Sequence, residues 1–240
     1  MTGTPLVIIG AGGFGREVHD VVEAMNDAAM LGERLPYHFL GFIDDGRPDA
    51  ELLDARGAPY LGAIGEIASL PADTRFTIAI GDGRARQRID EHLAKLGLKP
   101  ATLVHPAATL GLHGIVIGPG AVICSHASLT TNIRLGRHVH LNLNVTVGHD
   151  VVMGDYVTVN PGATISGNVT LEDECNIGTG AAVIQGVTVG RGSIIGAGAA
   201  VVTDIPPDVV AVGVPARPRS SIAGSTRSEG GEQRDTTPCR

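Results

Sequence analysis

Residues 141–171 read LNLNVTVGHDVVMGDYVTVNPGATISGNVTL, and an aliphatic residue returns at every sixth position of this stretch. The same spacing continues without a break from Ile117 to Val201. A second series, four residues after the first, runs from Ala121 to Ile205 and contains only small or β-branched residues. Neither an amphipathic helix nor a half-buried strand sustains a period of six. The period therefore predicts a parallel β-helix, in which stacked units bury one aliphatic column.

The composition agrees with a narrow aliphatic core. Of the 240 residues, 43% are hydrophobic but only 3% are aromatic, and tryptophan is absent. A triangular prism has room for Ile, Leu, Val and Ala, which explains the missing aromatic side chains. With three sides and about 18 residues to a coil, residues 117–206 supply about five coils. The in-phase Ile115 predicts that the stack begins near residue 107.

The region before the repeat has the pattern of an α/β fold. PLVIIGAGGFG at residues 5–15 is an apolar run with a glycine-rich turn, and residues 16–25 then show helical spacing. We expect further strands at 38–43 and 76–80, and a helix over 84–96. This order predicts a small Rossmann-like domain. It is too short for the doubly wound sheet that a nicotinamide dinucleotide needs, which disfavours an oxidoreductase.

Two features of this region are candidates for ligand binding. The amides of Gly12 and Gly13 precede a helix and can hold a phosphate, although a tight strand-to-helix connection also explains them. Asp44 and Asp45 follow the second expected strand. Ligands bind at the carboxyl ends of strands in open α/β sheets, so the pair either recognises a ribose or a base or lies in a solvated loop.

These patterns divide the chain into three parts. Residues 1–99 are expected to form the Rossmann-like domain, and residues 100–222 the β-helix with a C-terminal cap, joined by a link over 97–106. Residues 209–215 are expected to form a last strand or cap. Arg217 and Arg219 either meet the phosphates of a ligand or lie in solvent. The polar residues 223–240 are expected to be disordered.

Charge and cysteine content exclude several classes of partner. The chain has 18 Lys and Arg against 25 Asp and Glu, a net charge of −7, and so lacks a basic footprint for nucleic acid or anionic membrane. No apolar run approaches the ~20 residues that cross a bilayer. The three cysteines, Cys124, Cys175 and Cys239, lack CxxC spacing, so we expect no disulfide framework and no cysteine zinc site. We expect a soluble, cytoplasmic protein in which Cys175 packs inward.

His149 is the leading candidate among the nine histidines. It is the third residue of the unit that begins at Val147, beyond the inward-facing position, so its side chain should point outward. Asp150 can fix the tautomer of the imidazole if a turn brings the carboxylate back. The pair is either a general base with its orienting carboxylate or a hydrogen-bonded turn. Asn144 stands five positions earlier, so the two-histidine spacing of a β-helix carbonic anhydrase is absent and zinc catalysis is not expected.

Together these motifs resemble the sugar O-/N-acetyltransferase family of hexapeptide-repeat acyltransferases. This family includes sialic acid O-acetyltransferases and the nucleotide-4-amino-sugar N-acetyltransferases of bacillosamine and perosamine pathways. The matching stretches occur in the same order and are GAGGFGREV (10–18), DD (44–45), GDG (81–83), HPAA (105–108), LNLNVTVGHD (141–150), PGATISGNV (161–169) and GVPAR (213–217). The resemblance implies a left-handed β-helix and an acetyl-CoA-dependent enzyme. It also implies a homotrimer with the acyl donor in the grooves between subunits.

The resemblance also implies site residues. His149 would be the general base, Asp150 its orienting carboxylate, and Asn142 a neighbour of the catalytic pocket. The nucleotide-sugar site would be lined by Gly12, Gly13, Phe14, Asp44, Asp45 and Gly81. Backbone contacts to acetyl-CoA would come from Gly167, Thr179 and Ala197. Two positions depart from the family: Phe14 stands where many relatives have His, and Thr158 where at least one enzyme type has a second His.

The expected reaction is direct acetyl transfer to a nucleotide-linked amino sugar, with His149 removing a proton from the attacking amine. An O-acetyltransferase acting on sialic acid or another sugar hydroxyl is the nearest alternative, because either nucleophile can use the same base. A non-catalytic sugar-binding β-helix is a further alternative, which the His149–Asp150 pair disfavours.

Overall fold

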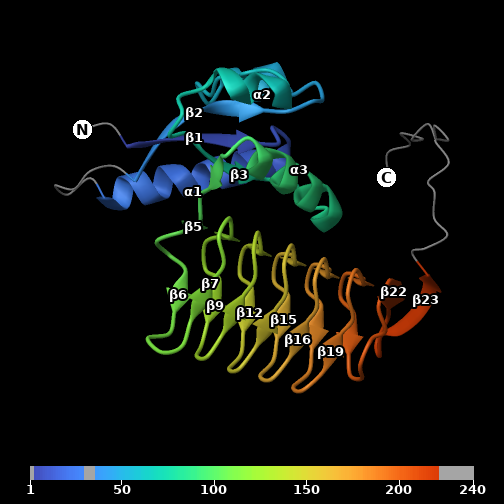
Figure 1. Ribbon diagram of the computed structural model, residues 1–240. Helices are drawn as coiled ribbons and strands as arrows, with labels where there is room; N and C mark the ends of the chain where they lie inside the picture. The colour runs from blue at the N-terminus through green and yellow to red at the C-terminus, as the bar shows by residue number, and fades with distance from the viewer. Residues whose placement is uncertain (1–2, 30–35, 222–240) are drawn as a thin grey trace, which may run out of the picture.

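The computed structural model describes residues 3–29 and 36–221. An α/β domain lies along one side of a long β-solenoid, which ends in a small cap (Figure 1). This arrangement confirms the predicted fold class of a small α/β domain followed by a parallel β-helix. The tail expected over residues 223–240, with Cys239, lies outside the described residues.

The α/β domain contains one parallel sheet with strand order β2-β1-β3-β4. Its strands are β1 (Thr4–Ile9), β2 (Tyr37–Ile43), β3 (Arg75–Ile78) and β4 (Lys99–Pro100). Its helices are α1 (Gly13–Ala29), α2 (Ala50–Asp54), the 3-10 helix η1 (Ile64–Ser69) and α3 (Gly83–Lys95). The predicted strands and the two long helices are present with ends shifted by a few residues. The short α2 and η1 were not predicted.

Both faces of this sheet are covered, which explains the continuous apolar run in β1. Leu6 and Ile8 belong to the buried cluster that includes Val18 of α1. Val7 and Ile9 belong to the cluster that includes Leu93 of α3. Because both faces are buried, the carboxyl ends of the strands are where this domain can offer a ligand site.

The solenoid has three sheets of short parallel strands. The sheet that faces the α/β domain, called the junction sheet, contains β5 (Leu103–Val104), β8 (Val122–Ile123), β11 (His140–Leu141), β14 (Thr158–Val159), β17 (Asn176–Ile177) and β20 (Ile194–Ile195). The second sheet contains β6 (Thr109–Leu110), β9 (Ser128–Leu129), β12 (Thr146–Val147), β15 (Thr164–Ile165), β18 (Ala182–Val183) and β21 (Ala200–Val201). The third contains β7 (Val116–Ile117), β10 (Arg134–Leu135), β13 (Val152–Met153), β16 (Thr170–Leu171) and β19 (Thr188–Val189).

The register of the sheets confirms the sequence period. His140 pairs with Val122 on one side and Thr158 on the other, so stacked strands are 18 residues apart. Both predicted apolar series point inward and are at most 5% exposed, except for Ile117 near the open end of the stack, which is half-buried. The interior is therefore a continuous aliphatic column that fixes which residues remain outside.

The start of the solenoid and the linker differ from the prediction. The stack begins at Leu103 rather than near residue 107, because β5 already pairs with β8. The expected link over 97–106 is largely ordered, since β4 pairs with β3 of the α/β domain. A chain that passes directly from one sheet to the next leaves little freedom between the two parts.

The last described residues form the cap. β22 (Val209–Val212) extends the junction sheet, and β23 (Arg217–Ser221) pairs with it antiparallel. The strand predicted over 209–215 is therefore shorter and is followed by a second one. Within the described ranges, no helix combines the length and apolar character needed to cross a membrane.

Candidate active site

His149 and Asp150 lie in the turn between β12 and β13, at the corner between the second and third sheets, called the His149 corner. Asp150 has a φ of +59°, in the left-handed region. This conformation folds its carboxylate back, so that Oδ2 lies 2.8 Å from Nδ1 of His149. Both side chains are about half exposed, at 49% and 46%. With Nδ1–H donating to the carboxylate, Nε2 of the neutral ring is the free acceptor, as a general base requires.

A third residue, Asn132, supports this pair. Its Nδ2 donates to Oδ1 of Asp150 over 3.1 Å, from the equivalent position one coil earlier. The hydrogen bond with His149, followed by that with Asn132, holds the pKa of Asp150 below its usual range. Sequence reasoning missed Asn132. The only signal for it was the 18-residue spacing from Asp150.

Gly167 lies against the imidazole of His149. A Cβ at this glycine would lie 2.4 Å from Nε2 and 2.5 Å from Cε1 of His149. The absence of a side chain therefore provides the space in which the ring lies. Gly167 was expected to contact acetyl-CoA, and the structure places it directly beside the candidate base.

Three other predicted residues lie at a different corner. Asn142 follows β11, Thr179 follows β17 and Ala197 follows β20, all at the corner between the junction and second sheets, called the Asn142 corner. Thr179 and Ala197 are exposed, whereas Asn142 is 6% exposed. A single chain does not bring these residues to His149.

The glycine turn of the α/β domain has an open part and a packed part. Gly12 and Gly13 are exposed, and a Cβ at either would meet nothing within 4 Å. Their amides precede or begin α1, where the helix dipole favours an anion. Phe14 instead turns to the solenoid, where its ring centroid lies 5.2 Å from that of His140. Gly81, at the end of another strand, is exposed.

The acidic pair of the α/β domain binds backbone amides of its own chain. Oδ2 of Asp44 accepts from the amide of Ala11 over 2.7 Å, and its Oδ1 accepts from Gly46 over 2.8 Å. Oδ1 of Asp45 accepts from the amide of Ile64 over 2.9 Å. Both carboxylates thus stabilise the loops at this sheet edge. Of their four oxygens, Oδ2 of Asp45 makes none of these contacts and can accept from a ligand.

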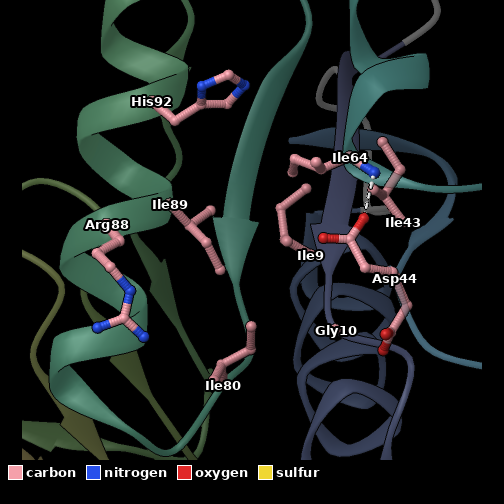
Figure 2. Close-up of a pocket in the computed structure, with 10 residues that line it drawn as sticks. Ile9, Gly10, Ile43, Asp44, Ile64, Ile80, Arg88, Ile89 and His92 are labelled. Atoms are coloured by element: carbon pink, nitrogen blue, oxygen red, sulfur yellow. Dashed lines mark hydrogen bonds between the residues drawn. The ribbon is translucent and has the colours of Figure 1, made fainter.

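A cleft of about 310 Å³ opens at the same edge. Figure 2 shows Arg88, Ile89 and His92 on α3 across from residues of β1 and β2. The cleft is lined by Ile9, Gly10, Ile43, Asp44, Asp45, Ile64, Ile80, Arg88, Ile89 and His92. Its isoleucines offer an apolar slot, and acidic and basic groups lie on opposite walls. Arg88 and His92 were not predicted, because a helical pattern alone does not show which strand ends a helix will cover.

The junction between the two parts contains a buried polar cluster. Asp90 of α3 is 2% exposed, forms hydrogen bonds with Arg137 and with the hydroxyl of Tyr156 (2.8 Å), and lies 3.0 Å from Nε2 of His138. Burial raises the pKa of Asp90, but the hydrogen bonds from Arg137, His138 and Tyr156 outweigh this and hold it below the usual range. Asp90 therefore stays ionised and binds three groups of the solenoid.

The thiols of Cys124 and Cys175 are poor candidates for chemistry. Cys124 and Cys175 are buried, and burial raises the pKa of each thiol to about 12. The inward packing of Cys175 is as predicted, and neither thiol supplies a thiolate nucleophile. Arg217 and Arg219 are exposed on β23. In the described ranges, no group of three or more His, Cys, Asp or Glu could hold a metal ion.

Comparison with known proteins identifies the α/β domain and a relative. Residues 5–93 match the family described as the PglD N-terminal domain. The chain is 34% identical over 157 residues to the GDP-perosamine N-acetyltransferase of Escherichia coli O157:H7. That alignment covers 60% of this chain and 61% of the E. coli protein.

Solved structures extend the likeness to both parts of the chain. The acetyltransferase domain of PglB from Neisseria gonorrhoeae, in complex with acetyl coenzyme A, is 36% identical, with a TM-score of 0.77 over 90% of this chain and 100% of that one. PerB from Caulobacter crescentus, in complex with CoA and GDP-perosamine, is 28% identical, with a TM-score of 0.79 over 90% and 97%. The resemblance inferred from the motifs is confirmed: the chain belongs to the family of left-handed β-helix sugar acetyltransferases that carry a PglD-type N-terminal domain.

Proposed function

We propose that this protein transfers an acetyl group from acetyl-CoA to the amine of a nucleotide-linked amino sugar, with His149 as the general base. The observation that carries the proposal is the half-exposed imidazole whose Nδ1 is held 2.8 Å from the Asp150 carboxylate. A structural turn histidine does not need a free Nε2, whereas a base does. The relatives with CoA and GDP-perosamine supply the substrate class.

The chemistry follows from the two ring nitrogens. The sugar amine attacks the thioester carbonyl, and Nε2 of His149 takes the proton that the amine loses as the C–N bond forms. The tetrahedral intermediate collapses with cleavage of the C–S bond, and the imidazolium returns the proton to the leaving thiolate. Asp150 stabilises the imidazolium, while a backbone amide at the groove would stabilise the oxyanion.

The nucleotide sugar would bind at the carboxyl edge of the α/β sheet. Gly12 and Gly13 supply open amides for a phosphate, Gly81 borders the same edge, and the isoleucine cleft accommodates a base. Oδ2 of Asp45 is available to a donor on the base or the ribose. Arg88 adds a positive charge on the opposite wall of the cleft, in keeping with a diphosphate ligand.

The position of His149 supports assembly of the site from two copies of the chain. The α/β domain covers the junction sheet, whereas His149 lies at the corner between the other two sheets. Asn142, Thr179 and Ala197 lie at yet another corner. A homotrimer, in which the His149 corner of one subunit faces the Asn142 corner and the α/β domain of the next, would bring these groups together around acetyl-CoA.

An O-acetyltransferase would use the same base. Whether the nucleophile is an amine or a hydroxyl therefore depends on which acceptor the protein binds. The cleft in the α/β domain favours a nucleotide-linked acceptor, and the named relatives favour an amine. The expected cytoplasmic location stays a prediction.

The proposal is tested by thiol release from acetyl-CoA with UDP-, dTDP- and GDP-linked amino sugars and their hydroxyl counterparts. We expect turnover with an amino sugar, and a loss of about 10²- to 10⁴-fold in His149→Ala with folding and oligomeric state unchanged. His113→Ala is the matched control, because His113 is also exposed and lies at the same corner two coils earlier. Turnover only with hydroxyl acceptors would favour O-transfer, and near wild-type turnover in His149→Ala would refute the role of the base.

A further inference from the structure

Arg86 of α3 is a buried cation whose partners are spread over both parts of the molecule. Its side chain is completely buried. Nη1 donates to the carbonyl oxygens of Ile80 (2.8 Å) and Gly81 (3.1 Å) in the α/β domain, and Nη2 donates to those of Tyr156 (2.5 Å) and Val157 (3.2 Å) in the solenoid. One guanidinium therefore joins the end of a sheet strand to β14.

Thr158 completes this connection from the solenoid. It is 2% exposed, and its hydroxyl donates to the Gly81 carbonyl over 3.0 Å while accepting from Nη1 of Arg86 over 2.9 Å. The Gly81 carbonyl thus accepts from a residue on each side of the junction. A hydroxyl serves as donor and acceptor at once, which valine, of similar shape, would not do.

The turn that follows Gly81 is also in close contact with the solenoid. A Cβ at Gly83 would lie 2.6 Å from the carbonyl oxygen of Tyr156 and 3.3 Å from Cα of Glu174. Asp82, between the two glycines, caps α3 by accepting from the amide of Ala85 over 2.8 Å. The turn has little space to shift without breaking these contacts.

From this arrangement we infer that Arg86 and Thr158 are positioning residues, which fix the Gly81–Gly83 turn, and the acceptor bound beside it, relative to the solenoid. The inference rests on the proposed function, because that function assigns the turn to nucleotide-sugar binding. Burial lowers the pKa of Arg86 to about 9, so the side chain remains a cation near neutral pH. A buried cation held mainly by carbonyl oxygens is sensitive to small changes in its neighbours.

This role has a consequence that a purely structural contact lacks. The acetyl donor is expected in grooves along the solenoid, whereas the acceptor is expected on the α/β domain. Loosening the turn should weaken binding of the acceptor and leave binding of the donor unchanged. Replacing a residue that only supports folding would lower the stability of the protein. It would change the affinities for both ligands together or leave both unchanged.

The test compares Thr158→Val, Thr158→Ser and the control Thr164→Val, which changes an exposed threonine at the equivalent strand position in β15. For each protein, KM is measured for the amino-sugar nucleotide and for acetyl-CoA. Calorimetric titration with UDP, dTDP, GDP and CoA gives the corresponding affinities. Amide exchange at Ala79, Ala85 and Arg86, whose hydrogen-bonded amides flank the turn, reports on the turn without any ligand. We expect Thr158→Val to raise KM for the acceptor about 3- to 10-fold, because the variant loses both hydrogen bonds of the hydroxyl while Arg86 still donates to the Gly81 carbonyl.

In the same variant, KM for acetyl-CoA should stay within about twofold, and exchange in the turn should accelerate. Thr158→Ser should restore wild-type values, and Thr164→Val should match wild type. Unchanged acceptor affinity, or an equal loss for both ligands, would overturn the inference and leave the proposed function intact. A wild-type protein that binds and acetylates no nucleotide-linked acceptor would overturn the proposed function, and the inference with it.

Discussion

The His149 corner and the junction between the two parts hold their polar side chains in place by contrasting means. At the corner, half-exposed side chains project from a regular stack, and Asn132 and Asp150 meet because they are 18 residues apart. At the junction, Asp90 and Arg86 are buried, and their hydrogen-bond partners in the solenoid lie 47 to 72 residues away along the chain. The repeat fixes where the side chains of the His149 corner lie, whereas the contacts at the junction depend on how two separate folds pack together.

The difference indicates where this molecule tolerates change. A side chain at the corner contributes little to burial, so replacing it should alter chemistry with little effect on stability. A polar group at the junction has no solvent to replace a lost partner, so its removal leaves other buried groups unpaired. Substitutions at the junction should therefore affect folding, geometry or both.

The largest expected effect is at the junction. Asp90→Ala removes the buried carboxylate that Arg137, His138 and Tyr156 share, and leaves the partly buried Arg137 without its anion. Breaking one side of such a pair costs about 3–5 kcal/mol. Urea unfolding measures this loss as a lower midpoint. Glu91→Ala, at the next position of the same helix, changes an exposed carboxylate and should cost less than about 0.5 kcal/mol.

If Asp90→Ala unfolds at nearly the same urea concentration as wild type, the junction is not the rigid connection described here. A reduced slope of the transition would instead show that the two parts unfold separately in the variant.

The sequence predicted the corner far better than the junction, for a physical reason. A column of aliphatic residues must recur every six positions, so the inward positions, and the outward position of His149, follow from counting. The roles of Arg86, Asp90 and Thr158 depend on the docking of two folds, for which a single sequence contains no periodic signal. Arg88 and His92 were missed likewise, and Asn142 was placed near the pocket only by resemblance.

A second, smaller effect is expected at the corner from Gly167→Ala. The new methyl group would overlap the ring of His149 and displace the imidazole, because the ring can move more easily than the stacked backbone. A shift of about 1 Å at a catalytic group can reduce turnover about 10- to 100-fold. Steady-state kinetics and the melting temperature should show a lower kcat with nearly unchanged stability. A raised KM for acetyl-CoA at unchanged kcat would instead support the backbone contact to the cofactor that the resemblance implies.

The smallest effect is expected from Asn132→Ala. This variant removes one hydrogen bond to Asp150 and leaves the contact between the carboxylate and His149 in place. Because both Asp150 and Asn132 are exposed, water can replace the lost donor, so kcat should fall only about 2- to 5-fold, in keeping with a weak, solvent-accessible hydrogen bond. Asn168→Ala is the matched control, since Asn168 lies at the same corner one coil after Asp150, is also exposed and has a φ of +56°, close to the +53° of Asn132.

Both alanine variants face the same backbone cost at a positive φ, so this cost cancels when their kinetics are compared. A decrease in kcat confined to Asn132→Ala would show that the Asn132 hydrogen bond orients the carboxylate. Equal decreases in the two variants would show that the turn backbone is responsible. In that case the regular stack itself would hold Asp150 in place, and the corner would need no side chain beyond the His149–Asp150 pair.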